Sequence, residues 1–265
     1  PGGVYTYEKS FLAPEEWKNQ DVVLEFEGIY GTARVWINGA LATVNRNGYM
    51  GFSVDLKPWI CYGQENLIKI DVDNSNQPNS RWYTGSGIYR DVNLWTGKGV
   101  YIPHDEMKIT TLSVNDDVAV VEVCANVKNT KECGIEAKCY VELIFEGKTV
   151  VTEKQNIVFY SGRKETVRVQ IPVKCPKKWS TDHPNLYQCC VKTYIGDEIC
   201  DEYTVDFGIR TLTLDPVNGF QINGETVNLR GTCIHHDNGV IGAETFPEAE
   251  WYRCKRLKEA GFNAI

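Results

Sequence analysis

Short runs of alternating apolar and polar residues, separated by turn-forming residues, constrain the fold of this chain more than any other feature. Alternation with a period of two buries one face of a strand and leaves the other in water, so the runs predict antiparallel β-strands. Asn38-Gly39 lies between two of them, and Asn-Gly tolerates the positive φ of a type I′ hairpin turn. In the first hundred residues we expect a jelly-roll sandwich, with strands at 22–26, 33–37, 40–44, 52–56, 66–73 and 88–94.

A second β-rich segment follows glycine and proline punctuation at 97–105, and we place a boundary near residue 101. Glu146-Gly147 and Gly196-Asp197 are predicted hairpin turns. Val121, Val123, Ala125 and Val127 mark one inward face, and residues 137–145 mark another. Seven short strands in about 100 residues predict an immunoglobulin-like sandwich, at 107–112, 118–128, 135–145, 149–159, 164–171, 187–195 and 199–207.

The pattern changes after Asp215-Pro216. A second Asn-Gly hairpin, with strands at 220–222 and 226–229, leads into VNLRGTCIHHD at 227–237. A helix is predicted at 247–260, with Pro247 in its first turn and Gly261 as its C′ residue, and a strand at 262–265. One strand, helix and strand cannot bury themselves. The helix carries apolar residues at helical spacing that should form a buried stripe, namely Trp251, Cys254, Leu257 and Ala260.

Composition excludes several classes of function. The net charge is -7 and the Lys and Arg residues are scattered, which excludes a nucleic-acid partner. No apolar run is long enough for a membrane span. The ten cysteines form no CxxC pair, so a zinc ribbon is not expected. Reduced core thiols are favoured over disulfides, and reduced thiols are typical of a cytoplasmic protein. Because the chain begins without Met, removal of an N-terminal targeting segment is an open alternative.

The segment 74–87, NSNQPNSRWYTGSG, combines turn formers with Arg81, Trp82 and Tyr83. Its aromatic side chains could pack against the edge of the sandwich as an ordinary surface loop. Alternatively, the rings could contact the C–H face of a sugar while the guanidinium donates to its hydroxyls. Both interpretations are open from the residues alone.

Several motifs resemble glycoside hydrolase family 2, the family of bacterial β-galactosidases, β-glucuronidases and β-mannosidases. In chain order they are YTYEKSF, VWING, SRWYTGSGIYRDVNLW, KWSTDHPNLYQ, FGIRTL, and LRG with KEAGFNAI. The resemblance implies a sugar-binding-type jelly roll at 1–100, which lacks some N-terminal residues usual in the family. An immunoglobulin-like domain at 101–212 and the truncated start of an eight-stranded (β/α) barrel at 213–265 would follow.

The resemblance also implies site residues. His235 falls after the first barrel strand, where related enzymes contact the sugar, and Asp237 would orient it. Arg81 and Trp82 would be further substrate-binding residues. An ordinary loop with satisfied hydrogen bonds is the alternative for His235, and Cys233 departs from the Asn that some relatives carry there.

A retaining glycosidase needs two carboxylates about 5 to 5.5 Å apart. In the family these are glutamates of later barrel strands, so we expect no catalytic residue within this chain and no activity from it alone. No metal or cofactor site is expected in it, although some relatives depend on magnesium or sodium.

The leading hypothesis is the N-terminal part of a β-galactosidase, binding β-galactosides and forming a homo-oligomer. β-Glucuronides or β-mannosides are alternative substrates. A non-catalytic carbohydrate-binding pair of sandwiches, or a purely structural pair, is the alternative of another class.

Overall fold

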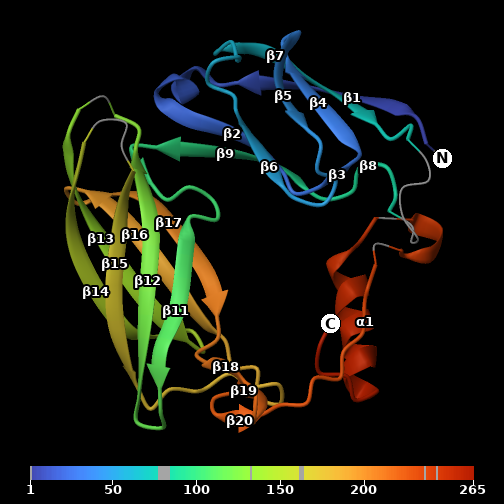
Figure 1. Ribbon diagram of the computed structural model, residues 1–265. Coiled ribbons are helices and arrows are strands. Elements are labelled where there is room, and N and C mark those ends of the chain that lie inside the picture. The colour runs from blue at the N-terminus through green and yellow to red at the C-terminus, as the bar shows by residue number, and fades with distance from the viewer. Residues whose placement is uncertain (1, 77–83, 132, 161–163, 236, 243) are drawn as a thin grey trace. The chain divides into compact units, whose positions relative to one another are not determined.

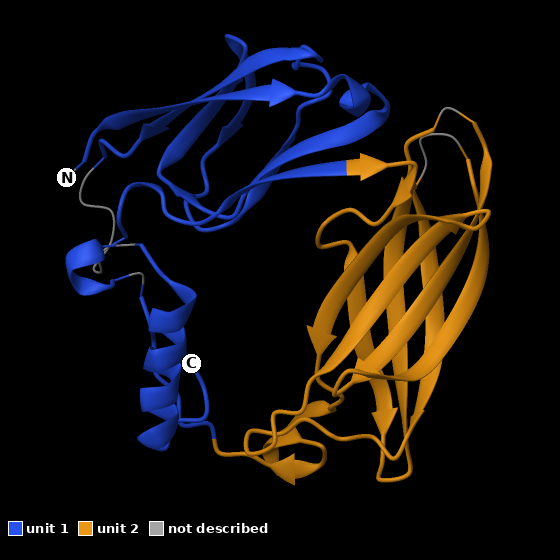
Figure 2. Ribbon diagram, turned by 180° about the vertical axis from the view of Figure 1, so that it is seen from behind, with its two compact units in different colours: residues 1–96, 229–265 blue, residues 97–228 orange. Residues whose placement is uncertain are grey.

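The computed structural model describes residues 2–76, 84–131, 133–160, 164–235, 237–242 and 244–265. The chain forms two compact units (Figure 2), one comprising residues 1–96 and 229–265 and the other residues 97–228. Antiparallel sheets dominate both (Figure 1), and the described residues contain one α-helix. The predicted mainly-β class is confirmed. No helix among the described residues is long and apolar enough to cross a membrane.

The first unit contains a sandwich of two antiparallel sheets. One sheet has the order β1 (Val4–Ala13), β7 (Gln64–Asp73), β4 (Thr32–Ile37) and β5 (Ala40–Asn45). The other has the order β6 (Phe52–Asp55), β2 (Gln20–Phe26) and β9 (Val92–Lys98), and a short pair joins β3 (Ile29–Tyr30) to β8 (Gly87–Ile88). The 3-10 turn η1 (Glu15–Asn19) connects β1 to β2. Inward side chains of both sheets share one core, including Val22, Phe26, Val35, Val54 and Val72.

Two strands of this sandwich differ from the sequence prediction. β1 lacks a clean alternation because most of its side chains are exposed at the edge of the sheet, and the pattern did not reveal it. The single strand expected at 88–94 is wrong, since β8 and β9 are separate. Between them Tyr89 is buried, and its hydroxyl donates to the Gly48 carbonyl over 2.9 Å. The chain turns inward there instead of extending one ladder.

The predicted hairpin at Asn38-Gly39 is confirmed, with φ of 50° and 83° at the two turn residues. The Asn38 side chain also fastens the turn to its neighbours. Its amide donates to the Trp59 carbonyl over 3.0 Å and to Asn66 Oδ1 over 2.8 Å, and its Oδ1 accepts from the Leu67 nitrogen over 2.9 Å. The turn is therefore part of a fixed network with β7.

The second unit is also a sandwich, and all seven strands predicted for it are present. One sheet joins β12 (Val118–Asn129) to β10 (Val100–Tyr101) and β11 (Met107–Val114) on one side and to β15 (Lys164–Lys174) on the other. The second sheet has the order β14 (Lys148–Phe159), β13 (Ile135–Phe145), β16 (Tyr187–Ile195) and β17 (Glu198–Phe207). The predicted inward residues of β12 are fully buried in the core.

The ten cysteines are free thiols. Cys139 and Cys189 face the core of the second unit, and burial raises the pKa of each thiol to about 12. They act there as small apolar side chains.

A short three-stranded sheet closes the second unit: β18 (Leu212–Asp215), β19 (Gly219–Ile222) and β20 (Glu225–Thr226). The predicted Asn223-Gly224 turn is confirmed by φ of 54° and 83°. Asn223 Nδ2 donates to the Trp179 carbonyl over 3.0 Å, and its Oδ1 accepts from the Thr211 nitrogen over 3.1 Å. The strand predicted at 226–229 is shorter than expected, because only Thr226 belongs to β20.

The last segment contains η2 (Gly239–Ile241) and α1 (Pro247–Glu259). Pro247 begins α1, and Gly261 follows it with φ of 89°. The nitrogens of Gly261 and Phe262 donate to the carbonyls of Lys258 and Leu257, which satisfies the last turn in a Schellman motif. The strand expected at 262–265 is reduced to one parallel bridge between Gly231 and Ala264. The described residues form no closed barrel.

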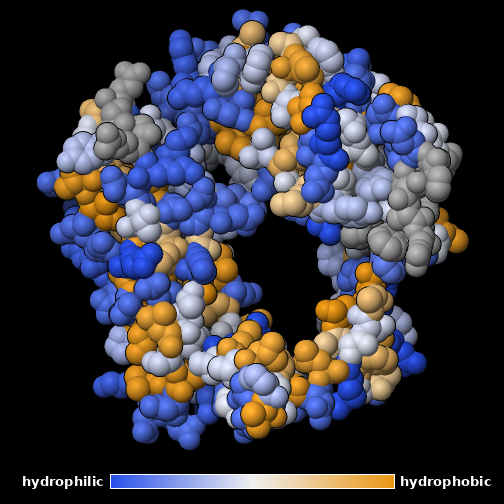
Figure 3. Space-filling view, in the orientation of Figure 1, coloured by the Kyte–Doolittle hydropathy of each residue, from blue (hydrophilic) through white to orange (hydrophobic). Residues whose placement is uncertain are grey.

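The stripe predicted on α1 was expected to need packing partners beyond one strand, helix and strand, so its burial stays a prediction. No residue of α1 is buried, and Trp251 is 64% exposed. Apolar side chains gather at the surface over α1 (Figure 3), including Phe246 and Tyr252. The helical spacing was read correctly, but a stripe becomes buried only when another element packs against it.

Candidate functional site

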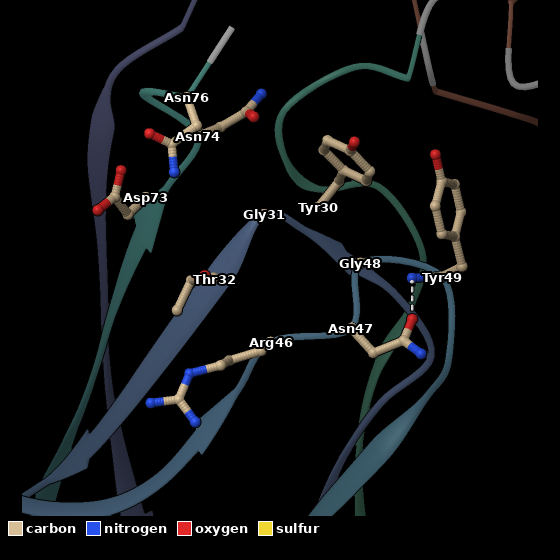
Figure 4. A pocket seen from close by; sticks show the side chains of 10 residues that line it. All are labelled: Tyr30, Gly31, Thr32, Arg46, Asn47, Gly48, Tyr49, Asp73, Asn74 and Asn76. Atoms are coloured by element: carbon tan, nitrogen blue, oxygen red, sulfur yellow. Dashed lines mark hydrogen bonds between the residues drawn. The ribbon is translucent and has the colours of Figure 1, made fainter. Parts of the chain in front are cut away.

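A hollow with a volume of about 510 Å³ opens at one end of the sandwich in the first unit (Figure 4). Three segments form it: the β3–β4 link, the loop after β5, and the end of β7 with the residues that follow. All its side chains are polar or aromatic. The lining residues are Tyr30, Gly31, Thr32, Arg46, Asn47, Gly48, Tyr49, Asp73, Asn74 and Asn76.

Two glycines allow these segments to approach one another. Gly31 has φ of 140°, and a Cβ there would lie 2.4 Å from the Asp73 carbonyl oxygen. At Gly48 a Cβ would lie 2.5 Å from the Tyr30 ring. Because a side chain at either position would collide with the opposite segment, the hollow depends on both glycines.

The loop after β5 is held by its own side chains. Asn47 Oδ1 accepts from the nitrogens of Tyr49 (2.9 Å) and Met50 (3.2 Å). Asn45 Nδ2 donates to the Asn47 carbonyl over 2.9 Å, and Tyr89 fixes Gly48 from inside the sandwich. The loop is thus ordered before any ligand arrives, which reduces the entropy lost on binding.

Tyr30 and Tyr49 form an aromatic corner in this hollow. Their ring centroids are 5.3 Å apart, with an angle of 65° between the planes. Figure 4 shows both rings on one side of the hollow, with Arg46 and Asp73 on the other. Rings on one side and hydrogen-bonding groups on the other suit a ligand with an apolar face and polar edges, as a pyranose has.

Asp73 is the one carboxylate among the lining residues. Its Oδ1 accepts from the Ser75 hydroxyl over 2.6 Å and from the Ser75 nitrogen over 3.1 Å. These bonds, with a smaller contribution from Arg34, lower the pKa of Asp73. Asp73 therefore stays ionised and serves as an acceptor, not as a general acid. A single carboxylate cannot supply the pair that glycoside hydrolysis needs, so the hollow is suited to binding and not to catalysis.

Of the residues proposed from the sequence, His235 and Asp237 do not line this hollow. His235 and Asp237 are both exposed, in the segment between the Gly231 bridge and η2, and the Asp237 nitrogen donates to the His235 carbonyl over 2.8 Å. Arg81 and Trp82 lie outside the described residues. Within either unit taken alone, the described residues bring no three metal-ligating side chains together.

The segment that follows His235 is anchored to α1. Asn238 Nδ2 donates to the Glu244 carbonyl over 2.7 Å, and the Asn238 nitrogen donates to the Gly242 carbonyl over 2.8 Å. Arg253 of α1 donates to Asn238 Oδ1 and also pairs with Glu250. This network gives the His235 segment a defined connection to the helix.

A second, smaller hollow of about 300 Å³ lies on the β13–β16 sheet of the other unit. Lys192 pairs with Glu142 over 2.9 Å, and Lys138 pairs with Asp197 over 3.3 Å. Its charged groups already satisfy one another, as in a cross-strand ladder. The hollow at the end of the first sandwich is the better candidate for a binding site.

Sequence reasoning did not single out the residues of that site. Tyr30, Arg46, Tyr49 and Asp73 come from three separate segments, and each looks like an ordinary strand end or turn residue. A usable signal was the Asn47-Gly48-Tyr49 run after β5, where a turn carries an exposed ring. Nothing in the sequence shows that the end of β7 lies beside it.

Two family models match the chain. Residues 1–98 match the model described as "Glycosyl hydrolases family 2, sugar binding domain", and residues 100–210 match the model "Glycosyl hydrolases family 2". The first match covers every lining residue of the hollow in the first unit.

Curated relatives match over the whole chain. The chain is 35% identical to β-galactosidase BoGH2A of Bacteroides ovatus, over 100% of the chain and 31% of that protein. It is 27% identical to a β-glucuronidase of Bacteroides fragilis, over 99% of the chain and 39% of that protein. The chain therefore spans less than half the length of either relative.

Solved structures agree with the fold. A family 2 glycosyl hydrolase from Bacteroides cellulosilyticus DSM 14838 superposes with a TM-score of 0.94 and 34% identity, covering 99% of this chain and 36% of that one. A β-glucuronidase from Bacteroides uniformis gives a TM-score of 0.89 at 25% identity, covering 99% of this chain and 33% of that one.

Proposed function

Because the chain belongs to glycoside hydrolase family 2, we propose that it is the N-terminal part of a retaining β-glycosidase that removes a terminal β-linked sugar. The observation that carries the proposal is that both family models match in order along one chain. The relatives include a β-galactosidase at 35% identity and a β-glucuronidase at 27%. A β-galactoside is the leading substrate class, with β-glucuronides and β-mannosides as alternatives.

The catalytic chemistry is proposed to reside in a (β/α) barrel, of which residues 213–265 would form the first unit. The parallel bridge between Gly231 and Ala264, with α1 between the two residues, supports this assignment because parallel neighbours joined by a helix are the repeat of such a barrel. The exposed apolar surface of α1 would be covered by the neighbouring helices.

A polypeptide of these 265 residues is expected to hydrolyse no glycoside. The hollow that suits a sugar is lined by one carboxylate, Asp73, and double displacement needs two, so that reaction cannot occur there. Release of p-nitrophenol from the β-galactoside, β-glucuronide and β-mannoside would be measured for this polypeptide and for the whole gene product. The whole gene product should cleave one of the three. Turnover by the 265-residue polypeptide would contradict the assignment of the chemistry to the barrel.

His235 is proposed to face the sugar in the whole protein, with Asp237 beside it. Its position just after the Gly231 bridge supports this role, because barrel enzymes act at the carboxyl ends of their strands. His235→Ala in the whole protein should lower kcat by about 100-fold, as the loss of one transition-state contact does. The matched control is His183→Ala, an exposed histidine in a turn of the other unit. Equal kcat for the two variants would exclude this role.

The hollow in the first unit is proposed to bind carbohydrate, in line with the sugar-binding description of the matching model. This proposal also serves the alternative function, a non-catalytic carbohydrate-binding module. Binding by the 265-residue polypeptide without hydrolysis by the whole gene product would favour that alternative.

A further inference from the structure

We propose that Trp179 and Arg210 are positioning residues for the glycosidase reaction, because they fasten the hairpin from which the chain enters the segment that carries His235. The inference rests on the proposed function and gives a part of the second unit a role in it. The two residues belong to the motifs KWSTDHPNLYQ and FGIRTL, and neither motif contributes a residue to either hollow.

The two motifs lie side by side in the structure. The guanidinium carbon of Arg210 is 4.1 Å from the centre of the Trp179 ring, where a cation is attracted to an aromatic face. The Trp179 nitrogen donates to the carbonyl of the fully buried Ile209 over 2.9 Å. A Cβ at Gly208 would lie 2.8 Å from the Trp179 side chain, so the close approach requires glycine. Trp179 is therefore held through both its backbone and its ring.

The Arg210 side chain acts through this ring. Among the residues that the structure describes, its guanidinium has no ion-pair partner, and its backbone nitrogen donates to the Thr111 hydroxyl over 3.3 Å. A partly desolvated cation on an indole face contributes more than a typical exposed ion pair does. The contact with Trp179 is therefore the interaction that a substitution of Arg210 would remove.

The same tryptophan fastens the turn between β19 and β20. Asn223 Nδ2 donates to the Trp179 carbonyl over 3.0 Å, and Asn223 Oδ1 accepts from the Thr211 nitrogen over 3.1 Å. The Asn223 nitrogen donates to the Thr211 carbonyl over 3.0 Å. We call Trp179, Arg210 and Asn223 the Trp179 clamp. It connects the turn to both motifs at one end of the second sandwich (Figure 1).

A short stretch of chain joins the clamped hairpin to the segment proposed for the barrel. The Val227 nitrogen still donates to the Phe220 carbonyl of the hairpin over 2.9 Å. The Arg230 nitrogen already donates to Asn263 Oδ1, beyond α1, over 2.7 Å. Residues 228 and 229 alone lie between these anchors, and so short a connection leaves little freedom. A displacement of the hairpin is therefore transmitted to the start of the segment that carries the proposed sugar contact.

The test uses the whole gene product. Arg210→Met keeps an unbranched stem and removes the cation, and we expect it to lower kcat about tenfold with KM unchanged, because a small misplacement far from the chemistry weakens contacts made in the transition state. Arg210→Lys keeps the charge and should restore most of kcat. Asn223→Asp loses the donor to the Trp179 carbonyl and should also lower kcat. Hydrogen exchange of the peptide 219–227, followed by mass spectrometry, should be faster in Arg210→Met and Asn223→Asp.

Lys154→Met is the matched control, because it removes another cation over a ring of the same unit, 5.7 Å from the centre of the Tyr140 ring. It should change neither kcat nor the exchange of 219–227. Faster exchange in Arg210→Met without a change in kcat would leave the clamp a structural contact and overturn the positioning role. An equal loss of kcat in Lys154→Met would overturn it as well. If the whole gene product cleaves none of the three p-nitrophenyl glycosides, the proposed function fails and the positioning role fails with it, whereas exchange still shows whether the clamp holds the hairpin.

Discussion

Asn66→Ala should destabilise the first unit by about 3 kcal/mol, because it removes one side chain of a buried polar network and leaves its partners without hydrogen bonds. Asn66 is 2% exposed. Its Oδ1 accepts from the Cys61 nitrogen over 2.7 Å and from Asn38 Nδ2 over 2.8 Å. Its Nδ2 donates to the carbonyls of Cys61 and Gln64, each over 2.9 Å. Alanine leaves four groups without these partners, and each buried group that cannot reach water costs about 1 to 3 kcal/mol.

The measurement is the free energy of unfolding of the first unit, from urea denaturation followed by hydrogen exchange at the β4 and β7 amides. Asn93→Ala is the matched control, because Asn93 makes one exposed hydrogen bond to Glu27 over 3.2 Å. That control should lose no more than about 0.5 kcal/mol. A loss of similar size in the two variants would show that the Asn66 network does not contribute to stability.

Gly31→Ala should lower the free energy of unfolding of the first unit by about as much as Asn66→Ala does, but through backbone strain and a steric clash. A φ of 140° is accessible to glycine and strained for alanine, and the new Cβ would lie 2.4 Å from a backbone oxygen that cannot move alone. That oxygen belongs to Asp73, whose pairing with Thr32 ends the β4–β7 ladder. Relief therefore requires the two strand ends to separate. We expect a loss of about 3 kcal/mol and, because Asp73 moves, weaker sugar binding.

Gly39→Ala is the control that distinguishes the steric clash with Asp73 from the strain of a positive φ. Gly39 also has a positive φ, 83°, but a Cβ there meets no atom within 4 Å. It should therefore cost only the backbone penalty of about 1 to 2 kcal/mol. Urea denaturation of both variants measures the difference. If Gly31→Ala were no more destabilising than Gly39→Ala, the close approach to Asp73 would not limit stability.

The two sandwiches could be predicted where burial alternates along a strand. The inward valines of β12 carry that signal, and the seven strands predicted between residues 107 and 207 were placed from such alternation, whereas the short strands β10 and β18 were not predicted. β1 gave no such signal because an edge strand with mostly exposed side chains lacks a period. The apolar stripe of α1 could be read from its spacing, but the element that covers Trp251 could not, because local spacing does not reveal a packing partner.

The candidate site was predictable to a smaller extent. The family resemblance pointed to carbohydrate and to His235, but not to the hollow formed by Tyr30, Arg46 and Asp73. These residues meet only because Gly31 and Gly48 permit a close approach of segments distant in sequence. Such an approach is a property of the fold, and local patterns record it only as isolated glycines.

The hairpin turns at Asn38-Gly39 and Glu146-Gly147 should differ in how well they tolerate an inserted sequence. Asn38-Gly39 and Glu146-Gly147 both have positive φ at their two turn residues. The Asn38 side chain is hydrogen-bonded to Trp59, Asn66 and Leu67, whereas the Glu146 side chain forms no hydrogen bond with any residue that the structure describes. Exposed loop tips without such anchors accept inserted sequence. A fluorescent label or an affinity tag placed between Glu146 and Gly147 should leave both sandwiches intact, whereas the same insertion at Asn38-Gly39 would break the network around Asn66.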